Sequence, residues 1–196
     1  TTFGISRDDS GKFLNDYIEN KIFSIDPFIS IDDGVGDLIE IAVEKGKKQN
    51  KKIAVFGIGG VGHMAIQFAK VENCDVIAFS RSQNHLDVAK RLGADDAIKF
   101  LENQEEFLKI LKEKHGTLDA AIVFAPADIV TDTAIKSVKK GGLIVIATVG
   151  ENPSFLAFEE KTIRGTLIGS TADMEQVIKI CDEKNIEVIT QTFPLE

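Results

Sequence analysis

A glycine-rich turn is the part of this sequence with the clearest chemical meaning. Between Lys52 and His63 the chain reads KIAVFGIGGVGH, an apolar run followed by the spacing G-x-G-x-x-G. Gly57 allows a tight turn, Gly59 lets the backbone approach a pyrophosphate, and Gly62 lets a following helix pack closely on the strand. The free N–H groups at the start of that helix attract phosphate. A purely structural turn is the alternative, but the context favours a dinucleotide site formed by Gly57, Gly59, Gly60, Val61 and Gly62.

The end of the next apolar run determines which dinucleotide is expected. NAD sites usually carry an acidic residue there, which holds the ribose 2′-hydroxyl. Here Asp75 precedes the run, and Ser80 and Arg81 follow it. A hydroxyl and a guanidinium suit a 2′-phosphate through charge-assisted hydrogen bonds, and a protonated His85 adds charge nearby. The sequence therefore predicts NADP(H) rather than NAD(H), with a solvated loop cation as the alternative for Arg81.

Two later strand ends are expected to complete the site. Ala125 and Pro126 follow one apolar run, and Thr148 and Val149 follow another. The carboxyl ends of parallel strands line the ligand crevice, so these four residues are expected to flank the ribose and nicotinamide. The pair at 141–142 is interpreted as a helix stop before a strand.

The same stretch offers no obvious catalytic machinery. None of the three histidines lies near a Cys or a carboxylate at zinc-ligand spacing, so no catalytic and no metal-binding residue is predicted. His63 is assigned either a polar role near the cofactor or local packing and capping, and His115 an ordinary place at a helix end. Cys74 and Cys181 are expected to be core or surface thiols.

These residues need a parallel sheet to position them. Short continuous apolar runs alternate with helical patterns, which indicates strands buried on both faces and an α/β, doubly wound (Rossmann) fold. The expected strands are 53–58, 76–79, 97–100, 120–124 and 143–148, and the expected helices are 61–71, 84–92, 105–115 and 129–138. Segments 165–169 and 186–191 are expected to supply the last strands, with a helix over 174–182 between them.

Composition narrows the function classes. The 196 residues carry 23 Lys and Arg against 31 Asp and Glu, for a net charge of −8. An acidic chain without a basic face argues against nucleic-acid binding, and no apolar run approaches the roughly 20 residues of a membrane span. Two cysteines form no disulfide framework, so the cytoplasm is the expected compartment. The chain starts without Met or a signal-peptide pattern, which favours a fragment.

Residues 1–50 differ from the rest. They hold an irregular, aromatic-dotted stretch, a short amphipathic helix near Leu38 and a basic tail. We expect a helical or irregular N-terminal appendage that is not an independent domain, followed by an NADP(H)-binding domain over 51–196.

The larger part resembles the coenzyme-binding domain of zinc-type, medium-chain alcohol dehydrogenases. The matching motifs are GIGGVGHMAIQFAK at 57–70, AKRLGAD at 89–95 and GGLIV at 141–145. Ser80-Arg81-Ser82 is similar to the NADP-preferring branch, which includes cinnamyl-alcohol-type reductases, although that branch often has Lys or Arg where this chain has His85. The resemblance implies hydride transfer between an alcohol and an aldehyde or ketone, with a zinc held by a separate domain whose motifs are absent here. We therefore expect cofactor binding without turnover by this chain alone.

Residues 1–52 resemble the C-terminal barrel of pyruvate, phosphate dikinase. The matching stretches are TFGISRDDSGKFL at 2–14, DPF at 26–28 and GVGDL at 34–38. The catalytic Cys of that family would fall where this chain has Phe56, so none of its chemistry is carried over. The two resemblances meet near residues 50–56, which suggests a hybrid chain, whether natural, engineered or an assembly artefact.

Two other function classes stay open. One is a non-catalytic dinucleotide-binding or interaction module, able to form a homo-oligomer through an edge strand within 163–169. The other is a fragment of a phosphoenolpyruvate-utilising dikinase, which the residues present speak against.

Overall fold

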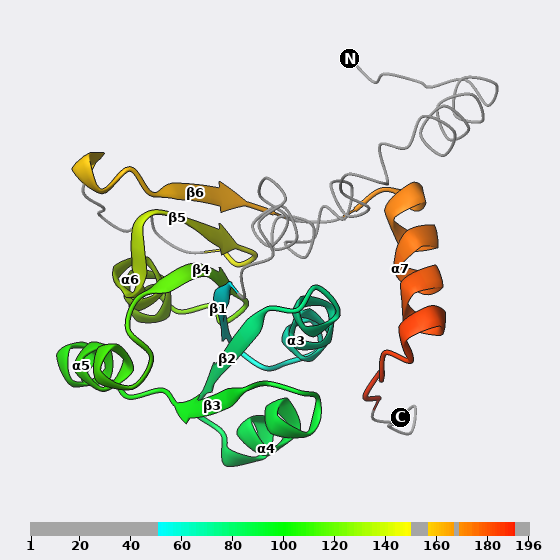
Figure 1. Ribbon diagram of the computed structural model, residues 1–196, viewed down its shortest axis with the longest axis horizontal. Coiled ribbons are helices and arrows are strands. Elements are labelled where there is room, and N and C mark those ends of the chain that lie inside the picture. The colour runs from blue at the N-terminus through cyan, green and yellow to red at the C-terminus, as the bar shows by residue number, and fades with distance from the viewer. Residues whose placement is uncertain (1–50, 150–156, 167–168, 191–196) are drawn as a thin grey trace, which may run out of the picture.

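Six parallel strands form one sheet with helices on both of its faces (Figure 1). This computed structural model describes residues 51–149, 157–166 and 169–190. The strand order is β3-β2-β1-β4-β5-β6, so the chain starts at the centre, winds to one edge and then returns to build the other half. This arrangement confirms the predicted doubly wound fold. The strands are β1 Lys52–Phe56, β2 Asp75–Ser80, β3 Asp96–Lys99, β4 Leu118–Val123, β5 Val138–Ile146 and β6 Thr162–Gly165.

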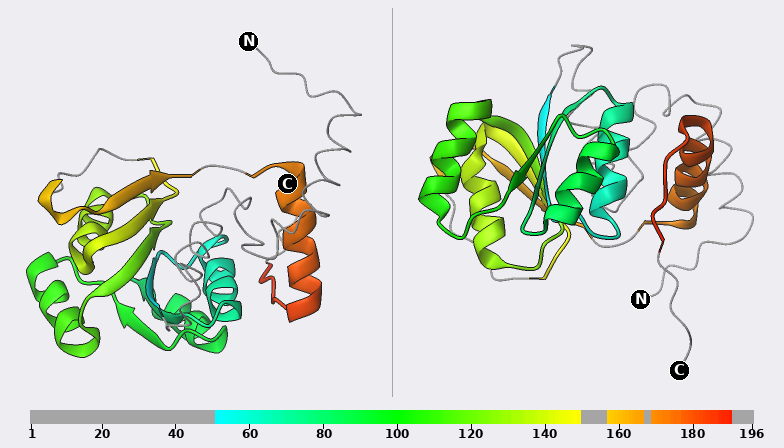
Figure 2. Two further views of the ribbon diagram at one scale, coloured as in Figure 1. Left: turned by 45° about the horizontal axis from the view of Figure 1, so that its top comes forward. Right: turned by 90° about the horizontal axis from the view of Figure 1, so that it is seen from below.

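The sheet is buried on both sides because successive residues of each strand point to opposite faces. Ile53 and Val55 of β1 pack toward α3 and α4 on one face, and Ala54 and Phe56 pack toward α5 and α6 on the other. Each large side chain buried in this way contributes about 1.5–3 kcal/mol to stability. Figure 2 shows the helices on the two faces of the sheet, with α7 beside α3. The helices are α3 Gly62–Val71, α4 Gln83–Arg91, α5 Gln104–His115, α6 Asp128–Ser137 and α7 Thr171–Lys184, with a short 3₁₀ turn, η3, at Ala157–Glu159.

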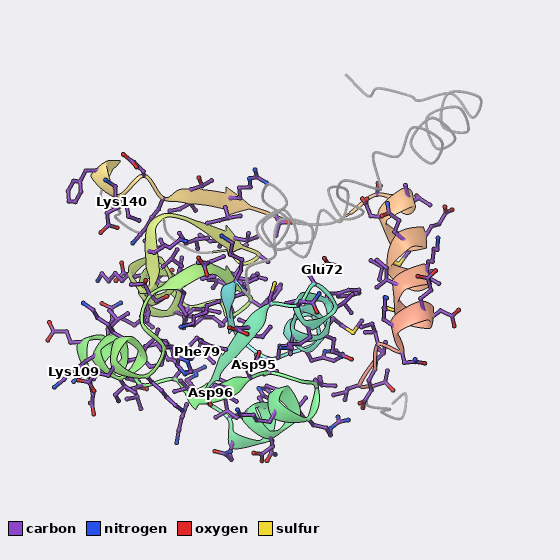
Figure 3. The ribbon with its side chains drawn as sticks, in the orientation of Figure 1. Glu72, Phe79, Asp95, Asp96, Lys109 and Lys140 are labelled. Carbon is purple, nitrogen blue, oxygen red and sulfur yellow. The ribbon has the colours of Figure 1, made fainter. Side chains whose placement is uncertain are left out.

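A charge cluster at the start of β3 fixes one edge of the sheet. The Asp96 carboxylate accepts from Lys114 Nζ at 2.6 Å and from His115 Nε2 at 2.7 Å, and Lys90 Nζ lies 3.3 Å away. Burial alone would raise the pKa of Asp96, but these hydrogen bonds outweigh it and hold the pKa well below its usual range. Figure 3 shows Asp96 beside Asp95 at this point. His115 therefore does more than end a helix, because it helps to join α5 to β3.

Three details differ from the sequence-based expectations. Residues 186–190 form no strand, although 186–191 was predicted to be one, and Gln191 lies outside the described residues. The sixth strand ends at Gly165, where the prediction had it begin. The glycine pair at 141–142 lies inside β5 rather than at a helix stop: α6 ends at Ser137, and the pairing with β4 jumps from Val138 to Leu143. A Cβ on Gly142 would lie 2.6 Å from the Asp119 carbonyl oxygen, so close backbone approach explains this glycine.

The predicted appendage over residues 1–50 lies outside the described part of the chain. Within the residues that the structure does describe, no helix has the length and apolar character needed to cross a bilayer.

Candidate functional site: a pocket at the carboxyl edge of the sheet

A pocket of about 540 Å³ opens where the central strands end. Its walls come from the ends of β1, β2 and β4 and from the loops that follow them. In sheets of this topology, the gap between the two halves of the sheet is the usual place for a ligand. Ten of the twelve predicted cofactor-binding residues line it: Gly57, Gly59, Gly60, Val61, Gly62, Ser80, Arg81, His85, Ala125 and Pro126.

Backbone hydrogen bonds between neighbouring strands continue up to the rim of this pocket. The Gly57 N–H donates to the Phe79 carbonyl at 3.0 Å, and the Phe124 N–H donates to the Phe56 carbonyl at 2.8 Å. On the next strand, the Ala147 N–H donates to the Val123 carbonyl at 3.0 Å. The loops therefore start from fixed positions rather than from frayed strand ends.

Packing within the protein explains two glycines of the turn. Gly57 has a φ of +96°, and a Cβ there would lie 2.8 Å from the Ala125 nitrogen across the gap between β1 and β4. A Cβ on Gly62 would lie 2.0 Å from the Gly57 carbonyl oxygen, closer than any real contact. Because Gly62 opens α3, its missing side chain lets that helix start directly above the end of β1.

The other two glycines have no such explanation. A Cβ on Gly59 or Gly60 would meet nothing within 4 Å, and neither residue has a positive φ. Both are exposed and both line the pocket. Their bare backbone is therefore not needed by the fold but leaves room for a ligand that approaches closely, as a pyrophosphate would.

The start of α3 faces this open space. Val61 occupies the N-cap position and makes no side-chain capping bond, and the first turn contains no acidic residue. The N–H groups of such a helix start carry partial positive charge and suit an anion. The open space above Gly59 and Gly60 and the uncapped start of α3 therefore fit the pyrophosphate of a dinucleotide.

Polar side chains gather at the end of β2. Ser80 Oγ lies 3.3 Å from His85 Nδ1 and accepts a hydrogen bond from the Ser82 N–H at 3.2 Å. Arg81 and His85 are both exposed and both line the pocket. The Ser80 hydroxyl thus fixes the loop while the two basic groups stay accessible, as recognition of a phosphate would require.

The residues predicted after β4 line the pocket, and the residues predicted after β5 do not. Ala125 and Pro126 lie in the pocket wall, together with Ala147. Thr148 and Val149 are outside the lining, and Val149 is 95% exposed. The predicted contacts of Thr148 and Val149 with the ribose or nicotinamide therefore have no counterpart in the lining of this pocket, and their role stays a prediction.

The base of the pocket is aromatic, which the sequence analysis did not predict. Phe56 and Phe79 stack at a centroid distance of 4.6 Å, and Phe100 meets Phe56 edge-on at 6.3 Å. All three line the pocket, and Phe79 is labelled in Figure 3. The signal was available, because each phenylalanine sits at or near the last position of an apolar run.

Comparison with known proteins adds a family to this geometry. A family model described as "Zinc-binding dehydrogenase" matches residues 60–183, well over half of the chain. The chain belongs to this family. An alcohol dehydrogenase of Geobacillus stearothermophilus is 30% identical over 158 residues, which cover 77% of this chain and 46% of that protein. The match confirms the resemblance to zinc-type alcohol dehydrogenases. The chain spans about half the length of such relatives.

Solved structures show the same fold. The alcohol dehydrogenase of Aeropyrum pernix matches with a TM-score of 0.65 and 22% identity, over 79% of this chain and 46% of that one. The D-arabinose dehydrogenase of Sulfolobus solfataricus also matches with a TM-score of 0.65, at 24% identity, over 82% of this chain and 52% of that one.

A second group of relatives belongs to a different enzyme. Pyruvate, phosphate dikinase of Rickettsia bellii is 42% identical over 102 residues, which make up 50% of this chain but only 11% of that protein. This match and the alcohol dehydrogenase match must overlap, because their coverages of 50% and 77% together exceed the chain.

The family name raises the question of zinc. Among the described residues, no group of three or more His, Cys, Asp or Glu side chains could hold a metal ion. Cys74 is buried in the core, and burial raises the pKa of its thiol to about 12, which disfavours the thiolate that binds metals. The described part of the chain fits a dinucleotide and does not fit a zinc centre.

Proposed function

We propose that this chain binds NADP(H) as the coenzyme-binding part of an alcohol dehydrogenase or aldehyde reductase. The observation that carries the proposal is the pair Gly59 and Gly60, whose bare backbone lines the pocket without any neighbour that requires it. In this proposal the pyrophosphate lies against that turn and the start of α3. The ten lining residues hold the cofactor, and in this proposal Thr148 and Val149, which lie outside the lining, also contact its ribose or nicotinamide.

The preference for NADP(H) rests on the end of β2. Arg81 offers a fixed positive charge and paired donors to a 2′-phosphate, and His85 lies on the same rim. A relative named NADP-dependent alcohol dehydrogenase 6, from Saccharomyces cerevisiae, is 28% identical over 160 residues and supports this choice. Among the residues that the structure describes, no acidic side chain lines this pocket to hold a ribose 2′-hydroxyl.

The pocket also indicates how the work is divided between the cofactor, this chain and a further domain. The nicotinamide, when bound, supplies or accepts the hydride. The residues described here bind and orient it, and among the described residues of the lining His85 is the one histidine or carboxylic acid, the residue types that usually move a substrate proton. In this proposal the alcohol or aldehyde pocket and the zinc belong to a further domain, so the chain alone binds cofactor without turnover.

A calorimetric titration tests the proposal directly. We expect the purified chain to bind NADPH at least about tenfold more tightly than NADH, since one charge-assisted pair is worth about 1.5–3 kcal/mol. Saturating NADPH at about 100 times the dissociation constant adds roughly 2.7 kcal/mol to stability and raises the Tm. If the chain is folded but binds neither NADPH nor NADH, the hypothesis of a non-catalytic interaction module is the better one. Measurable aldehyde reduction by the pure chain would overturn the division of labour.

A second proposal concerns self-association. Because β6 is an edge strand, paired only with β5 in the described sheet, we propose that it pairs with β6 of a second copy. Sedimentation velocity should then show a dimer, and a Pro substitution at Ile163 should give a monomer. A strictly monomeric chain at high concentration would contradict this pairing.

A third proposal concerns the origin of the chain. We infer that residues 1–50 come from a dikinase-type barrel and that the join falls near residues 50–56, supported by the partial dikinase match. Mass spectrometry of the native protein, together with the sequence of its gene, tests this. Peptides that span the join would support a true hybrid, and their absence would indicate an assembly artefact.

A further inference from the structure

The segment that follows α7 is held against α3 by a pair of hydrogen bonds between one side chain and the backbone of one residue. The Gln67 side chain donates from Nε2 to the Glu187 carbonyl at 2.8 Å, and its Oε1 accepts from the Glu187 N–H at 2.8 Å. Gln67 therefore satisfies both backbone groups of one residue, much as a neighbouring strand would. We call residues 186–190 the docked segment.

An ion pair adds a second anchor on α4. Arg91 Nη1 lies 2.6 Å from Glu187 Oε1. The hydrogen bond from Arg91 lowers the pKa of Glu187. Ile186 also packs against the core beneath α3. The docked segment is thus fixed by groups that do not line the cofactor pocket.

His63 connects this segment to the glycine turn. The imidazole is 5% exposed, with Nδ1 at 3.0 Å from the Gly59 carbonyl oxygen and Nε2 at 3.2 Å from the Ile189 nitrogen. A carbonyl oxygen can only accept and a backbone N–H can only donate. The ring must therefore be neutral, with its proton on Nδ1, so that it donates to Gly59 while accepting from Ile189.

This arrangement joins two parts of the chain that are 126 residues apart. Gly59 is one of the two glycines that the fold does not require, and its carbonyl also accepts the His63 backbone N–H at 3.2 Å. The side chain and the backbone of His63 therefore hold the same oxygen. One ring thus contacts both the docked segment and the turn.

We propose that His63 is a positioning residue that couples docking of residues 186–190 to the shape of the phosphate-binding turn. The inference rests on the proposed NADP(H) site for its ligand but not for the coupling itself. Because coupling between two sites is reciprocal, a bound dinucleotide must protect the docked segment to the same degree that the docked segment tightens the dinucleotide.

Two substitutions of His63 each keep one hydrogen bond of the imidazole and remove the other. In His63→Asn the amide reaches the position of Nδ1, so it can still donate to Gly59 but no longer reaches Ile189. In His63→Gln the amide reaches the position of Nε2, so it can still accept from Ile189 but leaves Gly59. A ring that served only as packing would give two variants that behave alike.

The docked segment can be loosened without touching the pocket. Gln67→Met keeps the volume of the side chain and removes both bonds to Glu187, together with the bond from Gln67 Nε2 to the His63 carbonyl at 3.2 Å. Because this third bond is lost in every His63 background, a direct effect of it at residue 63 would persist in His63→Asn. Lys70→Met on the same helix is the matched control, because Lys70 binds Asp95 and the Cys74 carbonyl rather than the docked segment.

The test measures amide hydrogen exchange at residues 63 and 189 in the ligand-free chain, and then the NADPH dissociation constant. We expect Gln67→Met to speed exchange at both amides and to weaken NADPH binding about fivefold or more. In the His63→Asn background exchange at 189 is already fast, so docking is followed at the Glu187 amide, which donates to Gln67 Oε1. Gln67→Met should still speed exchange at 187 in this background but leave residue 63 and the affinity unchanged. His63→Gln alone should keep exchange at 189 slow and make exchange at 63 fast, because it keeps the bond to Ile189 and loses the bond to Gly59. Lys70→Met should leave both exchange rates and the NADPH affinity unchanged.

The outcomes distinguish this inference from the proposed function. If the wild-type chain does not bind NADPH, the proposed function fails, while the exchange at residues 63 and 189 still decides the coupling. If Gln67→Met speeds exchange at 189 but leaves residue 63 and the NADPH affinity unchanged in the wild-type background, His63 does not transmit the docking and the inference is overturned.

Discussion

The two sides of the pocket are built in opposite ways. After β1, glycine occupies four positions of the turn. At Gly57 and Gly62 the close packing of the protein leaves no room for a side chain, and at Gly59 and Gly60 the glycine leaves open space. After β2, the rim is shaped by side chains that are present, namely Ser80, Arg81 and His85.

This difference separates two tasks. A glycine-rich turn can take any ligand that carries a pyrophosphate, because it offers backbone N–H groups and space. A rim with a guanidinium and an imidazole selects among such ligands by charge. Substitutions on the β1 side should therefore act on folding and on all dinucleotides, and substitutions on the β2 side should change preference alone.

The largest effect is expected from Gly62→Ala. The new Cβ would lie 2.0 Å from a backbone oxygen that cannot move freely, so α3 must shift away from β1. Overpacking of this kind costs about 3 kcal/mol, which should lower the Tm by roughly 5–10 °C. Thermal melts measure this. Gly165→Ala, whose Cβ would meet nothing within 4 Å, is the control. An unchanged Tm for Gly62→Ala would show that the turn is not shaped by packing.

Gly59→Ala should leave the fold intact and weaken every dinucleotide. Its Cβ meets no protein atom, so stability should change by less than about 1 kcal/mol. The methyl group would keep the pyrophosphate from the backbone, and we expect about tenfold or greater loss of affinity for NADPH and NADH alike. Titration of both nucleotides checks this. Loss for only one of them would break the proposed separation of tasks.

Arg81→Ala should change preference without changing the turn. Loss of a charge-assisted contact should weaken NADPH about tenfold and leave NADH unaffected. Lys99→Ala, at the exposed end of β3, removes the same charge outside the pocket lining and is the matched control. Equal weakening by both variants would point to long-range attraction rather than a contact.

The smallest effect is expected from His85→Lys. A permanent charge at this exposed position should tighten NADPH about threefold, the scale of one solvent-exposed ion pair, and leave NADH unchanged. Fluorescence titration of the reduced nicotinamide resolves such a change. Weaker NADPH binding would mean that the contact between Ser80 and His85 matters more than the charge.

Much of the fold could be predicted because buried parallel strands leave a clear pattern. The runs that contain Val55, Ile77 and Ile122 are apolar on both faces, and each proved to be a strand with a helix above and below it. The turn was equally clear, since Gly57 and Gly62 are fixed in spacing by the packing of β1, β4 and α3.

The failures occur where a sequence pattern has more than one physical cause. Ile186 and Val188 alternate with polar residues as an edge strand would, but here the extended chain is held by the Gln67 side chain instead of by a neighbouring strand. No local pattern identifies a partner 120 residues away. β6 was misplaced because it is mostly exposed and so lacks the apolar signal of a buried strand. The double role of His63 follows from the same distant contact.

The central position of β1 has a consequence for the order in which the molecule is made. Its first neighbour, β2, follows at once, but its second neighbour, β4, is not synthesised until much later: Lys52 and Asp119, which are hydrogen-bonded across these strands, are 67 residues apart. At about 5–20 residues per second, a ribosome needs several seconds to make that interval. During this time one edge of β1 has no strand beside it, and Gly57 has no Ala125 to face. The nascent chain can form the β2 rim early, but it can close the crevice only after β4 and the residues that follow it have left the ribosome. The ligand site therefore forms well after the strand and turn that begin it.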